Sequence, residues 1–264
     1  MIAEGLSAIE VDGRPATVEA LAPALAGYGH FSAMQVRDGR TRGLRFHLER
    51  LDGATRELFG AGLDAGRVRS LVRHALASAA QRDGSVRINV FQPVEAPGSP
   101  VRVLVTVRPP GGLRAAPYRV RSVLYQRPAA HLKHVGGFGQ GWFGRRVAAD
   151  GYDEALLTGP AGEVAEGAVT NVGFLDGDTV VWPTAPHLRG ITLQVLEERL
   201  HAAGVRQERR PVTLSEAVRY DGAFLTNSRG TAVIREIDGT PMPTGSPLLA
   251  TIAEAYASAP WDEI

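Results

Sequence analysis

The N-terminal part of the chain changes from alternating to helical hydrophobic patterns and back. Short apolar runs that alternate or end in a turn predict strands at residues 8–12, 28–39, 86–91 and 101–107. Leucines at helical intervals predict a helix over residues 44–60, and a second apolar stripe predicts a helix over residues 64–81. The β-α-α-β-β order of these elements predicts an α+β fold.

The C-terminal part continues this mixture of strands and helices. Strands are predicted at residues 118–125, 154–157, 222–227 and 232–239, with a strand–turn–strand unit at 164–183. Helices are predicted at residues 142–150, after Gly190, and from the Ser246-Pro247 pair, which is a typical helix start. Thr213 and Glu216 form a capping-box pair and predict a further short helix.

A stretch rich in proline and glycine separates the two parts. Residues 108–117 read RPPGGLRAAP, a sequence that continues neither a strand nor a helix. We therefore predict a small N-terminal domain at residues 1–112, an interdomain linker at 108–117 and a larger C-terminal domain at 118–264.

Composition narrows the class of protein. A net charge of +1 indicates no general attraction to nucleic acid or to a membrane surface. The chain has no cysteine, which excludes disulfides, thiolate metal sites and cysteine nucleophiles, and its seven histidines include no H-x-x-x-H pair. We see no signal peptide and no apolar run of membrane-spanning length, so we expect a soluble, cytoplasmic protein without a metal site.

Lys133 is the only lysine in a chain that contains 29 Lys and Arg residues. Arginine replaces lysine as a surface cation, but it does not supply an amine that loses its proton and attacks a carbon. Schiff-base chemistry and general-base catalysis both need such an amine. Chance retention explains the count equally well, so this hypothesis needs support from other motifs.

Four further features carry polar groups that could serve a ligand. Residues 188–192 (LRGIT) place a glycine and backbone N–H groups at a helix start, where anions bind, and residues 226–230 (TNSRG) form a turn rich in donors. Glu166 lies within a stretch predicted to be a buried strand, where a carboxylate needs a partner, and Arg50 lies on the first predicted helix. Each also has an ordinary structural explanation, as a capped helix start, a simple turn, an exposed strand end or a solvated cation.

Residues 139–144 (GQGWFG) match the dinucleotide fingerprint G-x-G-x-x-G. That fingerprint follows an apolar strand, whereas HLKHVG precedes it here. A nicotinamide-dependent oxidoreductase is therefore the least favoured alternative. We interpret the glycines as points where the backbone passes close to a neighbouring group, such as a bound ligand.

The order of these motifs resembles that of the class IV aminotransferase family, the fold-type IV pyridoxal 5′-phosphate (PLP) enzymes. The family pattern runs H-x-x-R-L, a lysine, G-x-D-E-A-L, E-G-x-x-x-N, L-x-G-I-T and a T-N-S turn. The matching stretches are residues 47–51, Lys133, and residues 151–156, 166–171, 188–192 and 226–228. Residues 28–39 resemble the family's opening strand. The family includes branched-chain and D-amino-acid aminotransferases and aminodeoxychorismate lyases. It implies a two-domain fold in which the larger domain has a pseudo-barrel sheet.

The resemblance assigns the chemistry to Lys133 and Glu166. Lys133 would hold PLP as a Schiff base and carry the proton between the substrate and the cofactor. Glu166 would bind the pyridine nitrogen and keep it protonated. The cofactor would lie between the two domains.

The resemblance also implies which residues bind the phosphate and the ring. The phosphate would be held by the backbone amides of Ile191 and Thr192, the Thr192 hydroxyl, Ser228 and Arg50. Leu188 would pack on the ring, and the turn from Thr226 to Arg229 would offer donors to the substrate carboxylate.

The sequence departs from the family pattern near the expected reacting atoms. Many members carry a tyrosine five residues after the lysine, where this chain has Phe138, and Ser32 follows Phe31 where an acid is frequent. Tyr28, Tyr125 and His134 are alternatives for the missing hydroxyl. Our candidate substrate-contacting residues are Tyr28, Phe31, His134, Phe138, Asn227 and Arg229.

The resemblance implies an aminotransferase that moves an amino group from an amino acid or amine to a 2-oxo acid, acting as a homodimer. Two alternatives remain open. One is a PLP lyase of the aminodeoxychorismate type, which releases pyruvate without an acceptor. The other is a cofactor-binding homologue without turnover, which the presence of Phe138 suggests.

Overall fold

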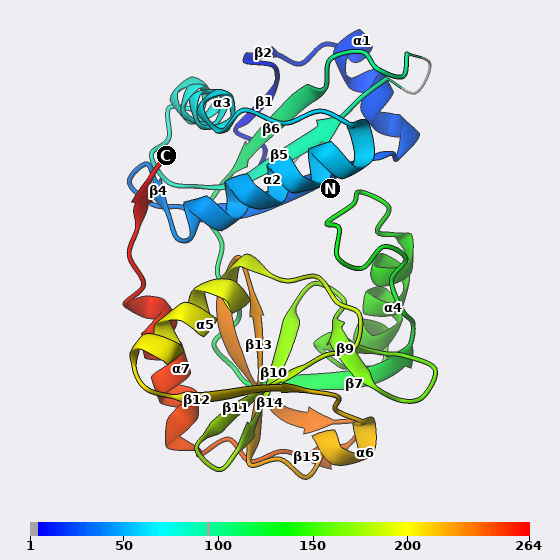
Figure 1. Cartoon of the computed structure of the whole chain (residues 1–264), viewed down its shortest axis with the longest axis vertical. Coiled ribbons are helices and arrows are strands. Elements are labelled where there is room, and N and C mark those ends of the chain that lie inside the picture. The colour runs from blue at the N-terminus through cyan, green and yellow to red at the C-terminus, as the bar shows by residue number, and fades with distance from the viewer. Residues whose placement is uncertain (1–4, 94–95) are drawn as a thin grey trace. The chain divides into compact units, whose positions relative to one another are not determined.

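The computed structural model describes residues 5–93 and 96–264, and its contacts divide the chain into two compact units (Figure 1). Unit 1 contains the chain up to Gly111 together with Leu132–Gly136 and Pro260–Ile264. Unit 2 contains Gly112–His131 and Gly137–Ala259. The first change of unit falls within the stretch predicted as a linker. The contacts group the segment around Lys133 with unit 1, whereas our division at residue 118 assigned it to the C-terminal domain.

Unit 1 is built on a five-stranded antiparallel sheet in the order β2-β1-β6-β5-β3. Its elements are β1 (Ala8–Val11), β2 (Arg14–Pro15), α1 (Val18–Leu21), η1 (Ala22–Ala26), β3 (Gly29–Val36), β4 (Arg40–Thr41), α2 (Leu44–Phe59), α3 (Ala65–Ser78), β5 (Gly84–Phe91), β6 (Arg102–Arg108) and β16 (Asp262–Glu263). The C-terminal β16 pairs with β4.

The core of unit 1 lies between the sheet and the two long helices α2 and α3 (Figure 1). Alternate residues of β3 and β5, such as Met34, Val36 and Ile88, are buried against these helices. Phe31 and Arg87 occupy the intervening positions and lie on the other face of the sheet. This alternation buries one face of the sheet against α2 and α3 and leaves Phe31 and Arg87 on the opposite face.

Unit 2 contains a nine-stranded sheet with the path β12-β11-β10-β13-β14-β7-β8-β9, and β15 pairs with β14. Its elements are β7 (Tyr118–Leu124), α4 (Phe138–Ala149), β8 (Glu154–Thr158), β9 (Val164–Gly167), β10 (Asn171–Asp176), β11 (Thr179–Pro183), α5 (Ile191–Ala202), β12 (Arg206–Arg210), α6 (Leu214–Ala217), β13 (Gly222–Asn227), β14 (Gly230–Ile237), β15 (Thr240–Pro241) and α7 (Pro247–Ala257).

This sheet curls, so that β9 at one end of the path returns close to β10 and β11. The curled sheet confirms the predicted pseudo-barrel and the α+β class. Helices α5 and α7 lie side by side against it and bury Leu196, Leu200 and Ile252 with Trp182 and Phe224 (Figure 1). A separate cluster around Phe174 and Tyr220 fills the other side.

Most predicted elements are present, and the differences have identifiable causes. The predicted strand–turn–strand unit at 164–183 contains three strands, because the chain turns at residues 168–170 between β9 and β10. The prediction that the following helix starts at Trp142 was wrong, because α4 already begins at Phe138. Glycines lower helix propensity, but a side chain at Gly139 would collide with the Tyr125 ring, so packing decides the helix start. The Thr213–Glu216 capping box is confirmed.

Two negative findings apply to residues 5–93 and 96–264. None of the helices described there is long and apolar enough to cross a membrane. No group of three or more His, Cys, Asp or Glu side chains in these ranges is arranged to hold a metal ion.

Replacing Gly173 on β10 by alanine should destabilise the protein. The added Cβ would collide with the Phe224 ring and meet Trp182 at 3.0 Å, and both rings are fully buried. We expect a loss of about 1–3 kcal/mol in the free energy of unfolding, measured by denaturant titration. Gly141→Ala is the matched control, because no atom lies within 4 Å of its Cβ and alanine favours helix α4. Equal stability of Gly173→Ala and wild type would contradict the packing described here.

Candidate functional site

Lys133 lies on a short extended segment that is hydrogen bonded to strand β3 of unit 1. The Phe31 N–H donates to the Lys133 carbonyl at 2.9 Å, and the Val135 N–H donates to the Gly29 carbonyl at 2.9 Å. His30 and His134 are therefore opposite each other in an antiparallel bridge. These bonds explain why the segment belongs to unit 1, and they fix the backbone from which the lysine side chain projects.

The Lys133 amine lies beside the aromatic ring of Phe31. Its Nζ is 4.9 Å from the ring centroid, while the Arg87 guanidinium stacks on the same ring at 3.5 Å. Burial is the main reason that the pKa of Arg87 is lowered, and the nearby charge of Arg108 lowers it further. This outer face of the sheet thus combines one amine, two guanidinium groups and an aromatic surface.

A second layer of polar groups lies on the helix side of β3. His47 of α2 is buried and its Nδ1 is 2.7 Å from the Ser32 hydroxyl. Burial, followed by the positive charges of Arg50 and Lys133, lowers the pKa of His47 to about 3, so the imidazole is neutral at physiological pH. Burial also lowers the pKa of Arg50 to about 10. Since Arg50 remains charged, this part of unit 1 favours an anionic ligand.

In unit 2 the buried carboxylate of Glu166 on β9 is held by two donors. Arg127 Nε donates to Glu166 Oε1 at 2.7 Å, and the side chains are only 3% and 6% exposed. The Leu188 N–H donates to Glu166 Oε2 at 3.2 Å. A terminal nitrogen of Arg127 also donates to the carbonyl of Ala130. Glu166 is therefore not an exposed strand end but a buried acceptor whose position is fixed by two donors.

The start of α5 is tied to the same network through Asn171. Its Nδ2 donates to the Leu188 carbonyl at 2.6 Å, and a side chain at Gly190 would collide with its Oδ1. Gly190 is therefore required by packing as the residue before α5. The first amides of a helix have no intrahelical acceptor, so the N–H groups of Ile191 and Thr192 can bind an anion.

The turn after β13 is joined to the start of α5 by one hydrogen bond. The Thr192 hydroxyl donates to the Asn227 carbonyl at 2.6 Å. The hydroxyl proton points to the turn, so Thr192 offers a phosphate its backbone amide rather than its hydroxyl. The Thr226 hydroxyl is 1% exposed and, among the described residues, has no hydrogen-bond partner. A buried hydroxyl without an acceptor fits a site that receives a ligand oxygen.

The predicted site residues are divided between the two units. Unit 1 contains Tyr28, Phe31, Arg50, Lys133 and His134, and unit 2 contains Phe138, Glu166, Leu188, Ile191, Thr192, Thr226, Asn227, Ser228 and Arg229.

Two of the aromatic candidates are turned toward solvent. Phe138, in the first turn of α4, is 82% exposed and stacks on Trp142 at 6.1 Å. Tyr28 is also exposed and packs edge-on against Phe59. Tyr125, another candidate for the missing hydroxyl, packs against Phe143 and Gly139.

Sequence reasoning missed two positioning residues. Arg127 was one of many arginines, and its role becomes visible only when its partner Glu166 is seen to be buried. Ser32 was noted only as a departure from the family pattern. Its hydroxyl is hydrogen bonded to the buried His47 ring on the helix side of β3, where an unpaired carboxylate would be costly to bury.

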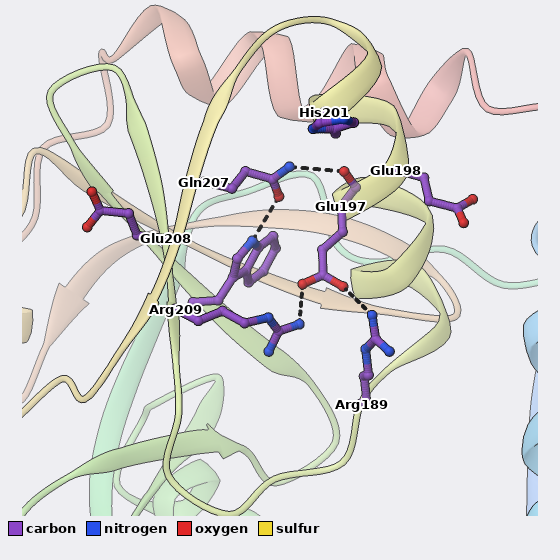
Figure 2. Close-up of a pocket in the computed structure, with 8 residues that line it drawn as sticks. Arg189, Glu197, Glu198, His201, Gln207, Glu208 and Arg209 are labelled. Carbon is purple, nitrogen blue, oxygen red and sulfur yellow. Dashed lines mark hydrogen bonds and ion pairs between the residues drawn. The ribbon is translucent and has the colours of Figure 1, made fainter.

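A groove of about 390 Å³ lies between α5 and β12, away from these groups (Figure 2). Figure 2 shows Glu197 of α5 between Arg189 and Arg209, with which it forms ion pairs. The Trp182 indole donates to Gln207 at 3.0 Å beneath them. None of the predicted site residues lines this groove, but the ion pair to Arg189 fixes the residue that precedes Gly190.

Comparison with known proteins identifies one family model along most of the chain. Residues 29–237 match the model described as amino-transferase class IV. A probable branched-chain-amino-acid aminotransferase of Rickettsia felis is 33% identical over 96 residues, which cover 36% of this chain. The match spans only 32% of the length of that relative.

Solved structures of similar shape cover nearly the whole chain. The branched-chain aminotransferase of the archaeon Thermoproteus uzoniensis, solved with norvaline, superposes with a TM-score of 0.84 at 23% identity, over 96% of this chain and 94% of that one. A PLP-bound hypothetical aminotransferase from Mycobacterium tuberculosis has a TM-score of 0.78 at 25% identity, over 90% of each chain.

Removing the partner of Glu166 should destabilise unit 2 strongly. Arg127→Leu leaves a buried carboxylate without its main donor, and such losses cost about 3–5 kcal/mol. Chemical denaturation of the protein without ligand measures the effect. The double variant Arg127→Leu with Glu166→Leu should recover part of the loss, because it removes the stranded charge. A double variant that simply sums the two single losses would speak against the pair.

Proposed function

The chain belongs to the class IV aminotransferase family, and on that premise we propose that it is a PLP-dependent aminotransferase in which Lys133 holds the cofactor. Enzymes of this family use PLP and act on amino acids and 2-oxo acids. PLP supplies a carbonyl carbon that binds amines and a protonated ring that accepts electrons from the substrate. The substrates proposed here are an amino acid or amine donor and a 2-oxo acid acceptor.

The observation that carries the proposal is the buried carboxyl group of Glu166 and its pairing with Arg127. In a strand interior such a carboxylate costs free energy unless it serves as an acceptor, and Arg127 and Leu188 leave it room for one more donor. A protonated pyridine nitrogen is a donor of the required kind. Glu166 would bind that nitrogen and keep its proton in place.

The polar groups around the start of α5 fit a phosphate. The amides of Ile191 and Thr192 provide donors at the positive end of a helix, and Ser228 lies in the adjoining turn. Arg50 of unit 1 would supply a guanidinium charge. The buried Thr226 hydroxyl, which lacks an acceptor among the described residues, supports a ligand oxygen nearby.

Lys133 would bind the cofactor through its amine and, once the substrate displaces it, carry a proton between substrate and cofactor. Phe31 and Arg87 restrict the directions in which the side chain can move. Residues Tyr28, His134, Phe138, Asn227 and Arg229 are proposed to contact the substrate. We further propose that both units serve one cofactor and that the protein acts as a homodimer.

The two half-reactions should be separable in single turnovers. With PLP bound and no acceptor, a suitable amino donor should release one equivalent of its 2-oxo acid. A 2-oxo acid added afterwards should release one equivalent of a new amino acid. Chromatography of the products from a panel of amino acids, at enzyme concentrations near those of the donor, measures both steps.

The same experiment tests the alternatives. Catalytic release of pyruvate without an acceptor would identify the lyase. If PLP binds but no donor in the panel yields a 2-oxo acid, the protein is a homologue without turnover. Wild-type protein that does not bind PLP would refute the family assignment of the cofactor.

Replacing Glu166 by glutamine should separate binding from catalysis. The variant keeps the shape of the side chain but no longer holds a proton on the ring nitrogen, so kcat should fall by orders of magnitude while PLP still binds. Steady-state kinetics and equilibrium dialysis against PLP report the two quantities. Glu208→Gln, which removes an exposed carboxylate of β12 at the groove in Figure 2, is a control that should keep nearly full activity. A Glu166→Gln enzyme with wild-type kcat would contradict the role.

A further inference from the structure

Glu154 is a second buried carboxyl group of unit 2, and the proposed reaction does not use it. It is the first residue of β8 and is 6% exposed. Its Oε1 accepts the N–H of Ala155 at 3.1 Å and the N–H of Ala168 at 3.1 Å. Ala168 begins the turn between β9 and β10, so this carboxyl group connects β8 to that turn.

The turn at residues 167–170 is packed tightly around this group. The Gly167 N–H donates to the Thr170 carbonyl at 2.8 Å, which closes the turn. A side chain at Gly167 would collide with the Thr170 hydroxyl and meet the Glu154 side chain at 3.3 Å. Gln140 of α4 donates to the Ala168 carbonyl at 2.5 Å and anchors the turn from its other side.

The two ends of this turn are the residues that build the candidate site. Glu166 precedes Gly167, and Asn171 follows Thr170. The two are also joined across Leu188, whose N–H donates to Glu166 and whose carbonyl accepts from Asn171. Glu166, Leu188 and Asn171 are therefore connected in a ring, through hydrogen bonds at Leu188 and through the backbone of the turn. A shift of the turn would move both the carboxylate and the start of α5.

We propose that Glu154 is a positioning residue that, as a carboxylate, holds the 167–170 turn and thereby sets the orientation of Glu166 and the approach to α5. This inference rests on the proposed function. The donors around Glu154 are N–H groups and the Thr170 hydroxyl, and all of them favour the ionised form. The Ala168 N–H is shared between Glu154 and the Ala155 carbonyl, which it meets at 3.0 Å. A protonated or amide side chain presents a hydrogen to these donors at one of its two polar atoms and weakens the turn.

The same group makes the turn sensitive to pH. Burial raises the pKa of Glu154 to about 7, while the N–H donors of residues 155, 168 and 169 oppose that rise. Across the sheet its register partner on β7 is Val120, and α4 faces β8 with Phe143, Val147 and Gln140.

Charged or titratable groups lie on each element next to Glu154: Glu166 on β9, Tyr118, Arg119 and Arg121 on β7, and Arg145 and Arg146 on α4. Arg119 pairs with Glu236, and its backbone N–H donates to Asp153, which precedes β8. Arginine and tyrosine side chains ordinarily titrate well above pH 7. We therefore attribute the pH dependence expected near pH 7 to Glu154.

The sign of the effect differs between stability and positioning. Because the folded pKa of Glu154 lies above its ordinary value of 4.5, its contribution to the free energy of unfolding falls as pH rises from 4.5 to about 7 and is constant above. The ionised form that holds the turn increases over the same interval. Cofactor affinity should therefore improve through pH 7 while this contribution to stability declines.

The test compares wild type with Glu154→Gln and two other variants. Glu236→Gln is the matched control, because it removes a carboxylate of β14, which is separated from β8 by β7, and this carboxylate pairs with Arg119 rather than with the turn. Gln140→Leu removes the other anchor of the turn without removing a titratable group. Near-ultraviolet circular dichroism first establishes that each variant is folded.

Hydrogen exchange of the peptide covering residues 164–172, in protein without cofactor, reports the turn directly. At pH 8.5, above the pKa of about 7 for Glu154, Glu154→Gln and Gln140→Leu should both be less protected than wild type after correction for intrinsic rates, and Glu236→Gln should match wild type.

Equilibrium dialysis against PLP between pH 6 and 8.5 provides the functional reading. At pH 8.5 the dissociation constant of Glu154→Gln should exceed that of wild type by about tenfold or more, the effect of one charge-assisted hydrogen bond. At pH 6 the ratio should approach one. A constant ratio across the range, or unchanged exchange in the turn, would overturn the inference. Failure of wild type to bind PLP would instead count against the proposed function, and the exchange result would still stand.

Discussion

The ion pair between Arg127 and Glu166 is the interaction on which the candidate site of unit 2 depends. A carboxylate this deeply buried persists only when donors offset the loss of water, and Arg127 is the main one. The Leu188 N–H adds a second donor and thereby fixes the loop before α5. Asn171 then joins that loop to β10. These contacts therefore fix the position of the Glu166 carboxyl group and the position of the start of α5 together.

Unit 1 contributes the segment that carries Lys133 and the charged groups near it. The backbone around Lys133 forms an isolated antiparallel bridge with β3 and is held there by two backbone hydrogen bonds. Arg87 stacks on the same Phe31 ring that the amine contacts. Arg50 carries a positive charge near His47, and His47 stays neutral because it is buried. An anionic ligand is favoured there, as it is at the start of α5. Each unit, taken by itself, thus carries groups that favour an anionic ligand.

The sequence indicated the family and most elements, because amphipathic periods and short motifs are local. It could not indicate Arg127, whose importance depends on a partner 39 positions away. The break between β9 and β10 was also hidden, since residues 168–170 are as apolar as the strands beside them and the break is held by Glu154. The helix predicted from Trp142 begins at Phe138, and the close approach of Gly139 to the Tyr125 ring in its first turn is not visible in the sequence. In each case a tertiary contact decided a local structure.

The most direct test of the central claim is reduction of the PLP-loaded protein with borohydride, followed by peptide mass mapping. With one lysine in the chain, the account predicts a single phosphopyridoxyl addition on the peptide containing Lys133, and none in a Lys133→Arg variant. The label should disappear when the protein is saturated beforehand with a productive amino donor. A label confined to the N-terminal amine, or protein that remains unlabelled after incubation with PLP, would contradict the account.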